Sequence, residues 1–267
     1  MNSLSVVIIT RNEEHNIVDC IQSAKLVSNN IIVVDAGSDD DTVKLAIGSG
    51  AKVFQVEWEG YGASRNFGAE KASFDWILSL DADERISKEL AASIHQLNLS
   101  DTNCIYRFRR QNYLGTQKIR FGTLGFETVK RIYHRNFASW DLTLVHEKLV
   151  SSSPIRKKIG GHINHYGLKD IEDYKARAVL YAQMSAEKYL LQGKKVGLLK
   201  RYFSPFFNSV KSFIFQFGFL DGELGFVVAK TTAYYSWLKY LYLHQLLNET
   251  KTKEFTFSPK AQVEGIN

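Results

Sequence analysis

The chain has 267 residues, of which 45% are hydrophobic and 23% charged, proportions that exclude a disordered protein and fit a large globular domain with an appendage. Its net charge of +6 hides an asymmetry, because residues 1–100 hold 8 basic and 15 acidic side chains whereas the remainder holds 26 and 13. The acidic part suits a metal site, and the basic part suits an anionic partner such as a diphosphate, a nucleic acid or a membrane surface.

The first third of the chain alternates strand patterns with helix patterns. Residues 5–10 form a nearly continuous β-branched run, which is typical of a parallel strand covered on both faces. Apolar side chains then recur at helical spacing over 17–26, and further strands are predicted at 31–34, 52–56 and 76–81. This alternation predicts an α/β fold with a doubly wound, mostly parallel sheet and flanking helices.

Polar residues stand where three of these strands end. Ligands of doubly wound sheets bind beyond the carboxyl ends of the strands, so we expect Thr10, Asp35 and Asp81 to lie around one cleft. Just after the second of these strands, Ser38 and Asp41 have the spacing of a capping box for the next helix.

The strand that begins at Trp76 ends in three carboxylates within four positions. On an extended backbone Asp81 and Asp83 point to the same side, so both can face one ligand. Carboxylates held this close repel each other, and a bound divalent cation relieves the repulsion. The alternative is a solvated acidic turn.

Four segments in succession, residues 7–14, 32–42, 65–68 and 80–84, resemble the signatures of family 2 glycosyltransferases in order and spacing. The whole-chain pattern is similar to the branch that adds sugars to bacterial lipopolysaccharide core. The resemblance implies a GT-A fold, a nucleotide-diphosphate sugar donor, Mn²⁺ or Mg²⁺ as cofactor, and inversion at the anomeric carbon.

The resemblance also implies roles for individual residues. Thr10 and Arg11 match positions that hold the nucleotide base, and Asp35 matches a carboxylate that contacts base or ribose. Asp81 matches the ribose contact, and Asp83 matches the metal ligand. The frequent Tyr at the position of Arg11 and the frequent second Asp directly after Asp35 are absent here, which leaves the identity of the base open.

Arg65 follows a Gly-flanked segment and can offer a fixed positive fork to the donor phosphates. The alternative is an arginine at a helix start that pairs with Glu70 or meets water.

Inverting transfer needs a base on the acceptor hydroxyl. Glu127, Asp141 and Glu147 are the candidates, and we favour Glu147 because it matches the family segment and has apolar neighbours that can raise a carboxylate pKa. The alternative for Glu147 is a surface pair with Lys148 or His146.

Residues 160–167 form a Gly-rich stretch with two histidines, which we interpret as a flexible loop. We expect His165 to contact the metal or the diphosphate. A structural hydrogen bond at a domain junction is the alternative.

The segment 105–135 is rich in aromatic residues and arginine, a mixture that can bind nucleic acid. It carries no RNA- or DNA-binding signature, so we predict no nucleic acid and favour an anionic glycolipid acceptor. Solvated strand faces are the alternative. The arginines concerned are Arg107, Arg109, Arg110, Arg120, Arg131 and Arg135.

The pattern becomes helical after Asp170, a plausible helix N-cap, and Gly193 is a plausible stop. A stripe at three- and four-residue spacing follows, made of Phe203, Phe206, Phe207, Val210, Phe213, Ile214 and Phe217. No stretch reaches the roughly 20 apolar residues that span a bilayer. We predict that this aromatic part contacts a membrane surface peripherally or forms the interface of a homo-oligomer.

We therefore predict a catalytic GT-A domain over residues 1–168, a helical part over 169–249 and a polar tail over 250–267. The predicted activity is inverting, metal-dependent sugar transfer to a glycolipid of a bacterial cell envelope. A sugar-phosphate nucleotidyltransferase is the first alternative, although the loop after the first strand lacks the glycines it would need. A non-catalytic protein that binds nucleotide sugars or membranes on the same scaffold is the second.

The predicted location is the cytoplasm, at the inner face of the cytoplasmic membrane. Cys20 and Cys104 form no disulfide framework or metal-ligand spacing, which indicates a reducing compartment. The N-terminus opens directly into an apolar strand, so no signal peptide is expected.

Overall fold

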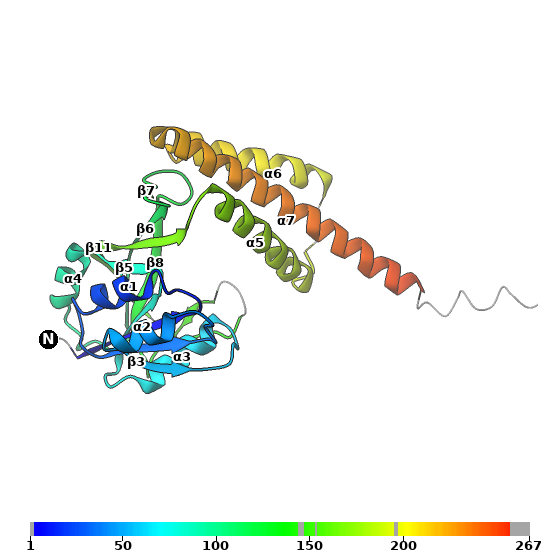
Figure 1. Ribbon diagram of the computed structural model, residues 1–267. Helices are drawn as coiled ribbons and strands as arrows, with labels where there is room; N and C mark the ends of the chain where they lie inside the picture. Colours follow the sequence, from blue (N-terminus) through cyan, green and yellow to red (C-terminus); the bar gives the residue numbers. More distant parts are fainter. Residues whose placement is uncertain (1–2, 144–146, 153, 195–196, 257–267) are drawn as a thin grey trace, which may run out of the picture. The chain divides into compact units, whose positions relative to one another are not determined.

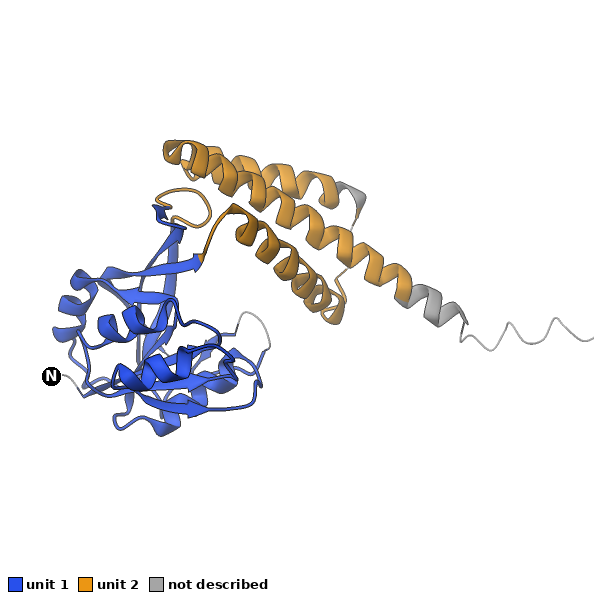
Figure 2. Ribbon diagram, viewed as in Figure 1, with its two compact units in different colours: residues 1–118, 126–167 blue, residues 119–125, 168–267 orange. Residues whose placement is uncertain are grey.

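The computed structural model describes residues 3–143, 147–152, 154–194 and 197–256. The chain divides into two compact units, which Figure 2 shows in different colours. Unit 1 comprises residues 1–118 and 126–167, and unit 2 comprises residues 119–125 and 168–267.

Unit 1 is built on a mixed sheet with the strand order β3-β2-β1-β4-β8-β6-β11-β5, and β7 pairs with β6 (Figure 1). Strands β1 to β4 are paired in parallel, whereas β8 joins β4 in the antiparallel sense. The predicted α/β architecture is confirmed, with antiparallel strands completing the sheet beyond β4. The strands are β1 (Leu4–Thr10), β2 (Ile31–Asp35), β3 (Lys52–Gln55), β4 (Trp76–Asp81), β5 (Glu84–Ile86), β6 (Cys104–Leu114), β7 (Gln117–Lys118), β8 (Glu127–His134) and β11 (Ile155–Leu168), and a separate pair is formed by β9 (Ser139–Trp140) and β10 (Leu149–Val150).

Helices cover both faces of this sheet because side chains alternate along each buried strand. Val6 and Ile8 of β1 pack in one cluster with residues of α1 and α4, whereas Val7 packs in a second cluster with residues of α3. Helix α3 approaches β1 closely, since a Cβ at Gly68 would lie 2.4 Å from Cγ1 of Val7. The helices of unit 1 are α1 (Ile17–Ala24), α2 (Thr42–Gly48), α3 (Tyr61–Lys71) and α4 (Lys88–His95).

Two local predictions were wrong. The segment 160–167 is part of the long strand β11 and not a loop, because its backbone is held by antiparallel pairing with β5. Ser38 does not cap the following helix, because its hydroxyl bonds the Asp35 carboxylate and the N–H of Asn12. Helix α2 starts later, at Thr42, and Asp40 accepts hydrogen bonds from the N–H and the hydroxyl of that residue.

Unit 2 is helical. Asp170 caps α5 (Ile171–Leu191) by accepting a hydrogen bond from the N–H of Asp173, and Gly193 follows the helix end with φ +64°, so both predicted boundaries are confirmed. The chain continues through α6 (Leu198–Val210), a π-helical turn η1 (Lys211–Phe215), a 3₁₀ turn η2 (Gly218–Asp221) and α7 (Glu223–Thr256). Helix α7 therefore contains the first residues of the predicted polar tail, and residues 257–267 lie outside the described part. None of the described helices combines the length and apolar character that crossing a bilayer requires.

The predicted phenylalanine stripe is largely exposed. Phe203 and Phe206 of α6 are 65% and 69% exposed, whereas Asn208 of the same helix donates a hydrogen bond to the Ser236 hydroxyl of α7. Thus α6 directs an amide toward its partner helix and phenyl rings away from it. We call the exposed set the aromatic surface: Tyr202, Phe203, Phe206, Phe207, Ile214, Phe215, Phe217, Phe219, Leu220 and Phe226.

Candidate active site

The carboxyl ends of the central strands meet as expected. Thr10 lies opposite Asp35 in the β1–β2 register, and Ile9 lies opposite Asp81 in the β1–β4 register. This alignment brings the three predicted polar residues to one edge of the sheet, because parallel strands end on the same side. The hydroxyl oxygen of Thr10 is buried and has no hydrogen-bond partner among the described residues.

The loops that follow β1 and β2 are joined by hydrogen bonds. The N–H of Glu13 donates to the Thr42 hydroxyl (2.8 Å), and the N–H of Asp39 donates to the Asn12 side-chain oxygen (3.0 Å). Asp35 is fully buried and accepts from the backbone N–H groups of Gly37 (3.2 Å) and Ser38 (3.0 Å). Asp35 therefore shapes the second loop, while Arg11 is exposed on the first.

Asp81 is held between two arginines from distant parts of the chain. Its Oδ1 pairs with Arg65 of α3 at 2.5 Å, and its Oδ2 pairs with Arg131 of β8 at 2.8 Å. Burial alone would raise the pKa of this carboxyl, but Arg131, Arg65 and Arg110 together hold it well below its usual range. Asp81 is thus a fixed anion with the orientation of both oxygens set.

The predicted phosphate contact, Arg65, has partners within the protein. Its side chain is 2% exposed, and it donates to the Ser79 hydroxyl and to Asp81. Its Nε lies 3.5 Å from the Glu147 carboxylate, and its guanidinium lies 4.8 Å from the ring centroid of Trp140. Arg65 pairs with neither Glu70 nor bulk water, and the geometry links it directly to two other predicted site residues.

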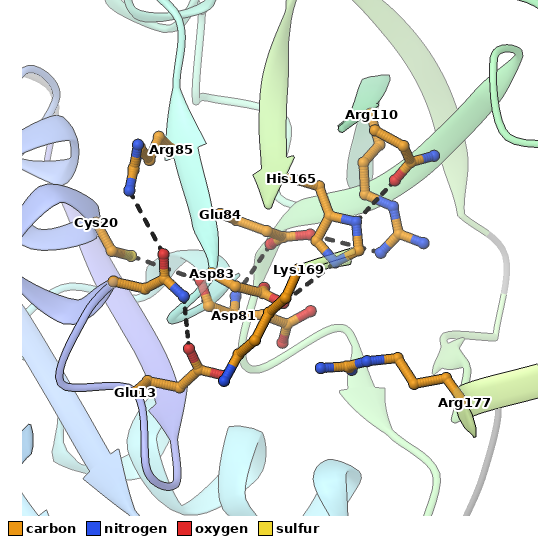
Figure 3. A network of polar contacts seen from close by, with 12 residues as sticks. Glu13, Cys20, Asp81, Asp83, Glu84, Arg85, Arg110, His165, Lys169 and Arg177 are labelled. Carbon is orange, nitrogen blue, oxygen red and sulfur yellow. Dashed lines mark hydrogen bonds and ion pairs between the residues drawn. The ribbon is translucent and has the colours of Figure 1, made fainter. Parts of the chain in front are cut away.

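Asp83 and His165 face each other, with 3.3 Å between Oδ2 and Nε2 (Figure 3). The antiparallel register of β11 with β5 places His165 opposite Glu84 and so beside the turn that carries Asp83. Burial opposes a charged imidazole, but the Asp83 carboxylate prevails and raises the pKa of His165. The space between the two side chains depends on Gly167, where a Cβ would lie 2.7 Å from both Asp83 Oδ2 and His165 Nε2.

The residues present fit a divalent cation in part. The Oδ1 atom of Asp83 is buried and has no hydrogen-bond partner among the described residues, and an imidazole nitrogen lies beside the same carboxylate. No group of three or more His, Cys, Asp or Glu side chains in the described part of the chain is arranged to hold a metal ion. The protein would supply two ligands here, and oxygens of a bound ligand and of water would supply the others.

The three base candidates differ in their surroundings. Glu127 forms a two-pronged pair with Arg110 (3.0 and 2.6 Å), and Asp141 accepts hydrogen bonds from within its own loop. The Glu147 side chain is 15% exposed, and its carboxylate lies 3.5 Å from the Arg65 guanidinium. The adjacent His146 lies outside the described residues.

The sequence did not identify the charged groups that contact Asp81 from the protein side, which are Glu84 and the arginines paired with it. Glu84 is fully buried, accepts from the N–H of Asp81 (3.0 Å), and pairs with Arg131 (2.9 Å) and Arg110 (3.6 Å). Arg135 pairs with Asp75 at 2.7 Å. Three arginines of the segment read as an acceptor site therefore bind carboxylates of the protein itself. The one available signal was the position of Glu84 directly after the Asp81–Asp83 motif.

One family model and several proteins of known sequence match more than half of this chain. Residues 5–159, more than half of the chain, match the model of the family described as "Glycosyl transferase family 2". An uncharacterized glycosyltransferase of Rickettsia typhi is 32% identical over 259 residues, covering 92% of this chain and 88% of that protein. The lipopolysaccharide core biosynthesis glycosyltransferase LpsC of Rhizobium meliloti is 28% identical over 254 residues, covering 91% of this chain and 92% of that protein.

Among solved structures, glucosyl-3-phosphoglycerate synthase from Mycobacterium tuberculosis, in complex with Mn²⁺, uridine diphosphate and glucosyl-3-phosphoglycerate, is 27% identical with a TM-score of 0.33. The match covers 41% of this chain and 44% of that one.

Proposed function

Because the chain belongs to glycosyl transferase family 2, we propose that it transfers a sugar from a nucleotide-diphosphate donor to a hydroxyl of a cell-envelope glycolipid, with inversion at the anomeric carbon. The observation that carries the proposal is the Asp83–His165 pair beside the ends of β1, β2 and β4. The Oδ1 atom of this carboxylate is buried and lacks a partner among the described residues, which supports a role as a cation ligand.

In this proposal Asp83 and His165 would hold Mn²⁺ or Mg²⁺ beside the donor diphosphate. A cation bound there would offset the negative charge that develops on the diphosphate as it leaves. Asp81 would accept hydrogen bonds from the ribose, since its two oxygens are already oriented by Arg65 and Arg131. Thr10, Arg11 and the loop shaped by Asp35 would hold the base.

Glu147 would be the base. The acceptor oxygen forms a bond to the anomeric carbon while the bond from that carbon to the diphosphate breaks, and the hydroxyl proton passes to the Glu147 carboxylate. Arg65 bridges Glu147 and Asp81. Arg65 would therefore position these two carboxylates and would not bind the donor phosphates directly.

For the acceptor we propose an anionic glycolipid of the lipopolysaccharide-core class, reached at the inner face of the bacterial cytoplasmic membrane. The name of the Rhizobium meliloti relative supports this class. The aromatic surface supports peripheral contact with a membrane, because exposed phenyl rings beside the exposed Lys200 and Lys211 suit the boundary between acyl chains and headgroups. A second copy of the chain is the competing occupant of that surface.

Direct binding measurements test the donor site. Thermal shift with a panel of nucleotide-diphosphate sugars, with and without Mn²⁺, should identify one donor that raises the melting temperature only when the metal is present. Asp83→Ala should abolish the metal-dependent part of this shift while the protein stays folded. The proposed metal role fails if a folded Asp83→Ala protein retains the full shift and undiminished transfer.

A further inference from the structure

His165 is the end of a chain of partly buried hydrogen bonds that begins at Arg110. The Arg110 guanidinium donates two hydrogen bonds to the Glu127 carboxylate, which also accepts one from the Asn112 side-chain nitrogen at 3.0 Å. The Asn112 side-chain oxygen lies 2.7 Å from Nδ1 of His165, whose Nε2 faces Asp83. Figure 3 shows the two ends of this chain, with Arg110 at one end and His165 facing Asp83 at the other.

This order of contacts determines which way the Asn112 amide points. Glu127 is held as an anion, because Arg110 and Asn112 outweigh the effect of burial and lower its pKa. A carboxylate only accepts hydrogen bonds, so the amide nitrogen of Asn112 must face Glu127. The amide oxygen must then face His165.

The orientation of Asn112 in turn fixes the proton on the imidazole. An amide oxygen can only accept, so Nδ1 of His165 must carry a hydrogen and donate it. When Nε2 loses the proton that the Asp83 carboxylate favours, Nδ1 keeps its hydrogen and the Nε2 lone pair faces Asp83. The wrong tautomer would direct an N–H toward the carboxylate and leave Nδ1 against the amide oxygen.

We propose that Asn112 is a positioning residue that, anchored by Glu127 and Arg110, holds His165 with Nε2 presented for a divalent cation beside Asp83. The inference rests on the proposed metal role of Asp83 and His165 and assigns the device that makes His165 competent for it. Asn112 is 2% exposed and belongs to β6, which neighbours β11 in the sheet, so both partners are fixed by the backbone. Groups that orient a ligating histidine in this way typically change metal affinity by about 10–100-fold.

Mn²⁺ alone is the probe, with two readouts on the folded protein. Electron paramagnetic resonance titration measures the dissociation constant, and modulation of the Mn²⁺ echo by ¹⁴N reports whether an imidazole nitrogen is coordinated. Asn112→Leu keeps the size of the side chain and removes its hydrogen bonds to Glu127 and His165. We expect it to weaken Mn²⁺ binding about 10–100-fold and to reduce the ¹⁴N modulation. Asn112→Ala serves instead if the leucine variant does not fold.

Two further variants separate positioning from general damage. Asn164→Ala alters the residue next to His165 on β11, which bonds the Tyr113 hydroxyl, and should leave both readouts unchanged. In a His165→Ala background the Asn112 substitution should cause no additional loss, because it acts only through the imidazole. An equal loss in both backgrounds overturns the proposal.

The tautomer is measured without metal. One- and two-bond ¹H–¹⁵N correlations should show that Nδ1 of His165 carries a hydrogen, and a ring with its hydrogen on Nε2 alone overturns the assignment. The outcomes also separate this inference from the proposed function. If His165→Ala binds Mn²⁺ as tightly as the unaltered protein, the metal role itself fails; if His165→Ala weakens binding and Asn112→Leu does not, only the positioning role fails.

Discussion

Replacing Arg131 with methionine removes a buried cation from between two carboxylates. The Arg131 side chain is 5% exposed, and its Nη2 lies 2.8 Å from Asp81 and 2.9 Å from Glu84. Removing one partner of a buried ion pair usually costs about 3–5 kcal/mol, because the remaining charge is left uncompensated. Asp81 keeps Arg65 and Glu84 keeps Arg110, so we expect the lower end, about 3 kcal/mol.

Thermal and urea unfolding followed by circular dichroism measure this cost. For a chain of this size, about 3 kcal/mol corresponds to a fall in melting temperature of roughly 6–12 °C. Arg107→Met, on an exposed position of β6, is the matched control and should change stability by less than about 0.5 kcal/mol. Adding Glu84→Gln to Arg131→Met should recover part of the loss, because it removes an uncompensated charge. An Arg131→Met protein as stable as the control would refute the reasoning that these ion pairs hold the site together.

Three further predictions follow from the same contacts. Glu147→Gln should keep the affinity for the donor but lower the steady-state rate of sugar transfer by about 10²–10⁴-fold, as expected for loss of a general base. A rate within a few-fold of that of the unaltered protein would mean that Glu147 has a structural role. The double variant Phe203→Ser, Phe206→Ser should reduce the fraction of protein that sediments with anionic liposomes at high salt. The control Phe74→Ser, at an exposed position of unit 1, should not change that fraction. If the protein does not bind liposomes at low salt and forms a compact dimer, the aromatic surface is a subunit interface. The pKa of Glu127 is lowered in the folded protein, so its charge contributes fully to stability above the unfolded pKa of about 4.3. Glu127→Gln should therefore lower the free energy of unfolding near neutral pH, as measured by urea titration. The difference from the unaltered protein should shrink as the pH falls below about 4. A deficit that stays constant down to acid pH would contradict that assignment.

Much of the fold was predictable because the signals are local. Continuous apolar runs marked β1, β2 and β4, and the alternation of strands with helices implied a sheet wound on both faces. Since parallel strands end on one side, the convergence of Thr10, Asp35 and Asp81 required no knowledge of packing. The caps of α5 were equally local, because a capping side chain bonds a backbone N–H only a few residues away.

The second layer of the site depended on strand pairing between distant segments. Arg131 reaches Asp81 and Glu84 only because β8 pairs with β4, and Asn112 reaches His165 only because β6 lies beside β11. The sequence showed that the segment 105–135 is rich in arginine, but it did not show which carboxylates these arginines pair with. Composition alone therefore favoured an external anion for arginines that bind internal carboxylates.

The sequence by itself determined the strands β1, β2 and β4, the boundaries of α5, and that Asp35 and Asp81 stand at the ends of parallel strands. Only the tertiary structure decided that residues 160–167 form a strand, that Ser38 bonds Asp35, and that Arg65 lies between Asp81 and Glu147. The physical reason is that periodicity reports the direction of a side chain relative to its own backbone. Burial and ion pairing of a side chain depend on which other residues the fold places opposite that side chain. Helix α6 is an example: the spacing of its phenylalanines predicted an apolar face, but only the fold shows that this face points away from α7.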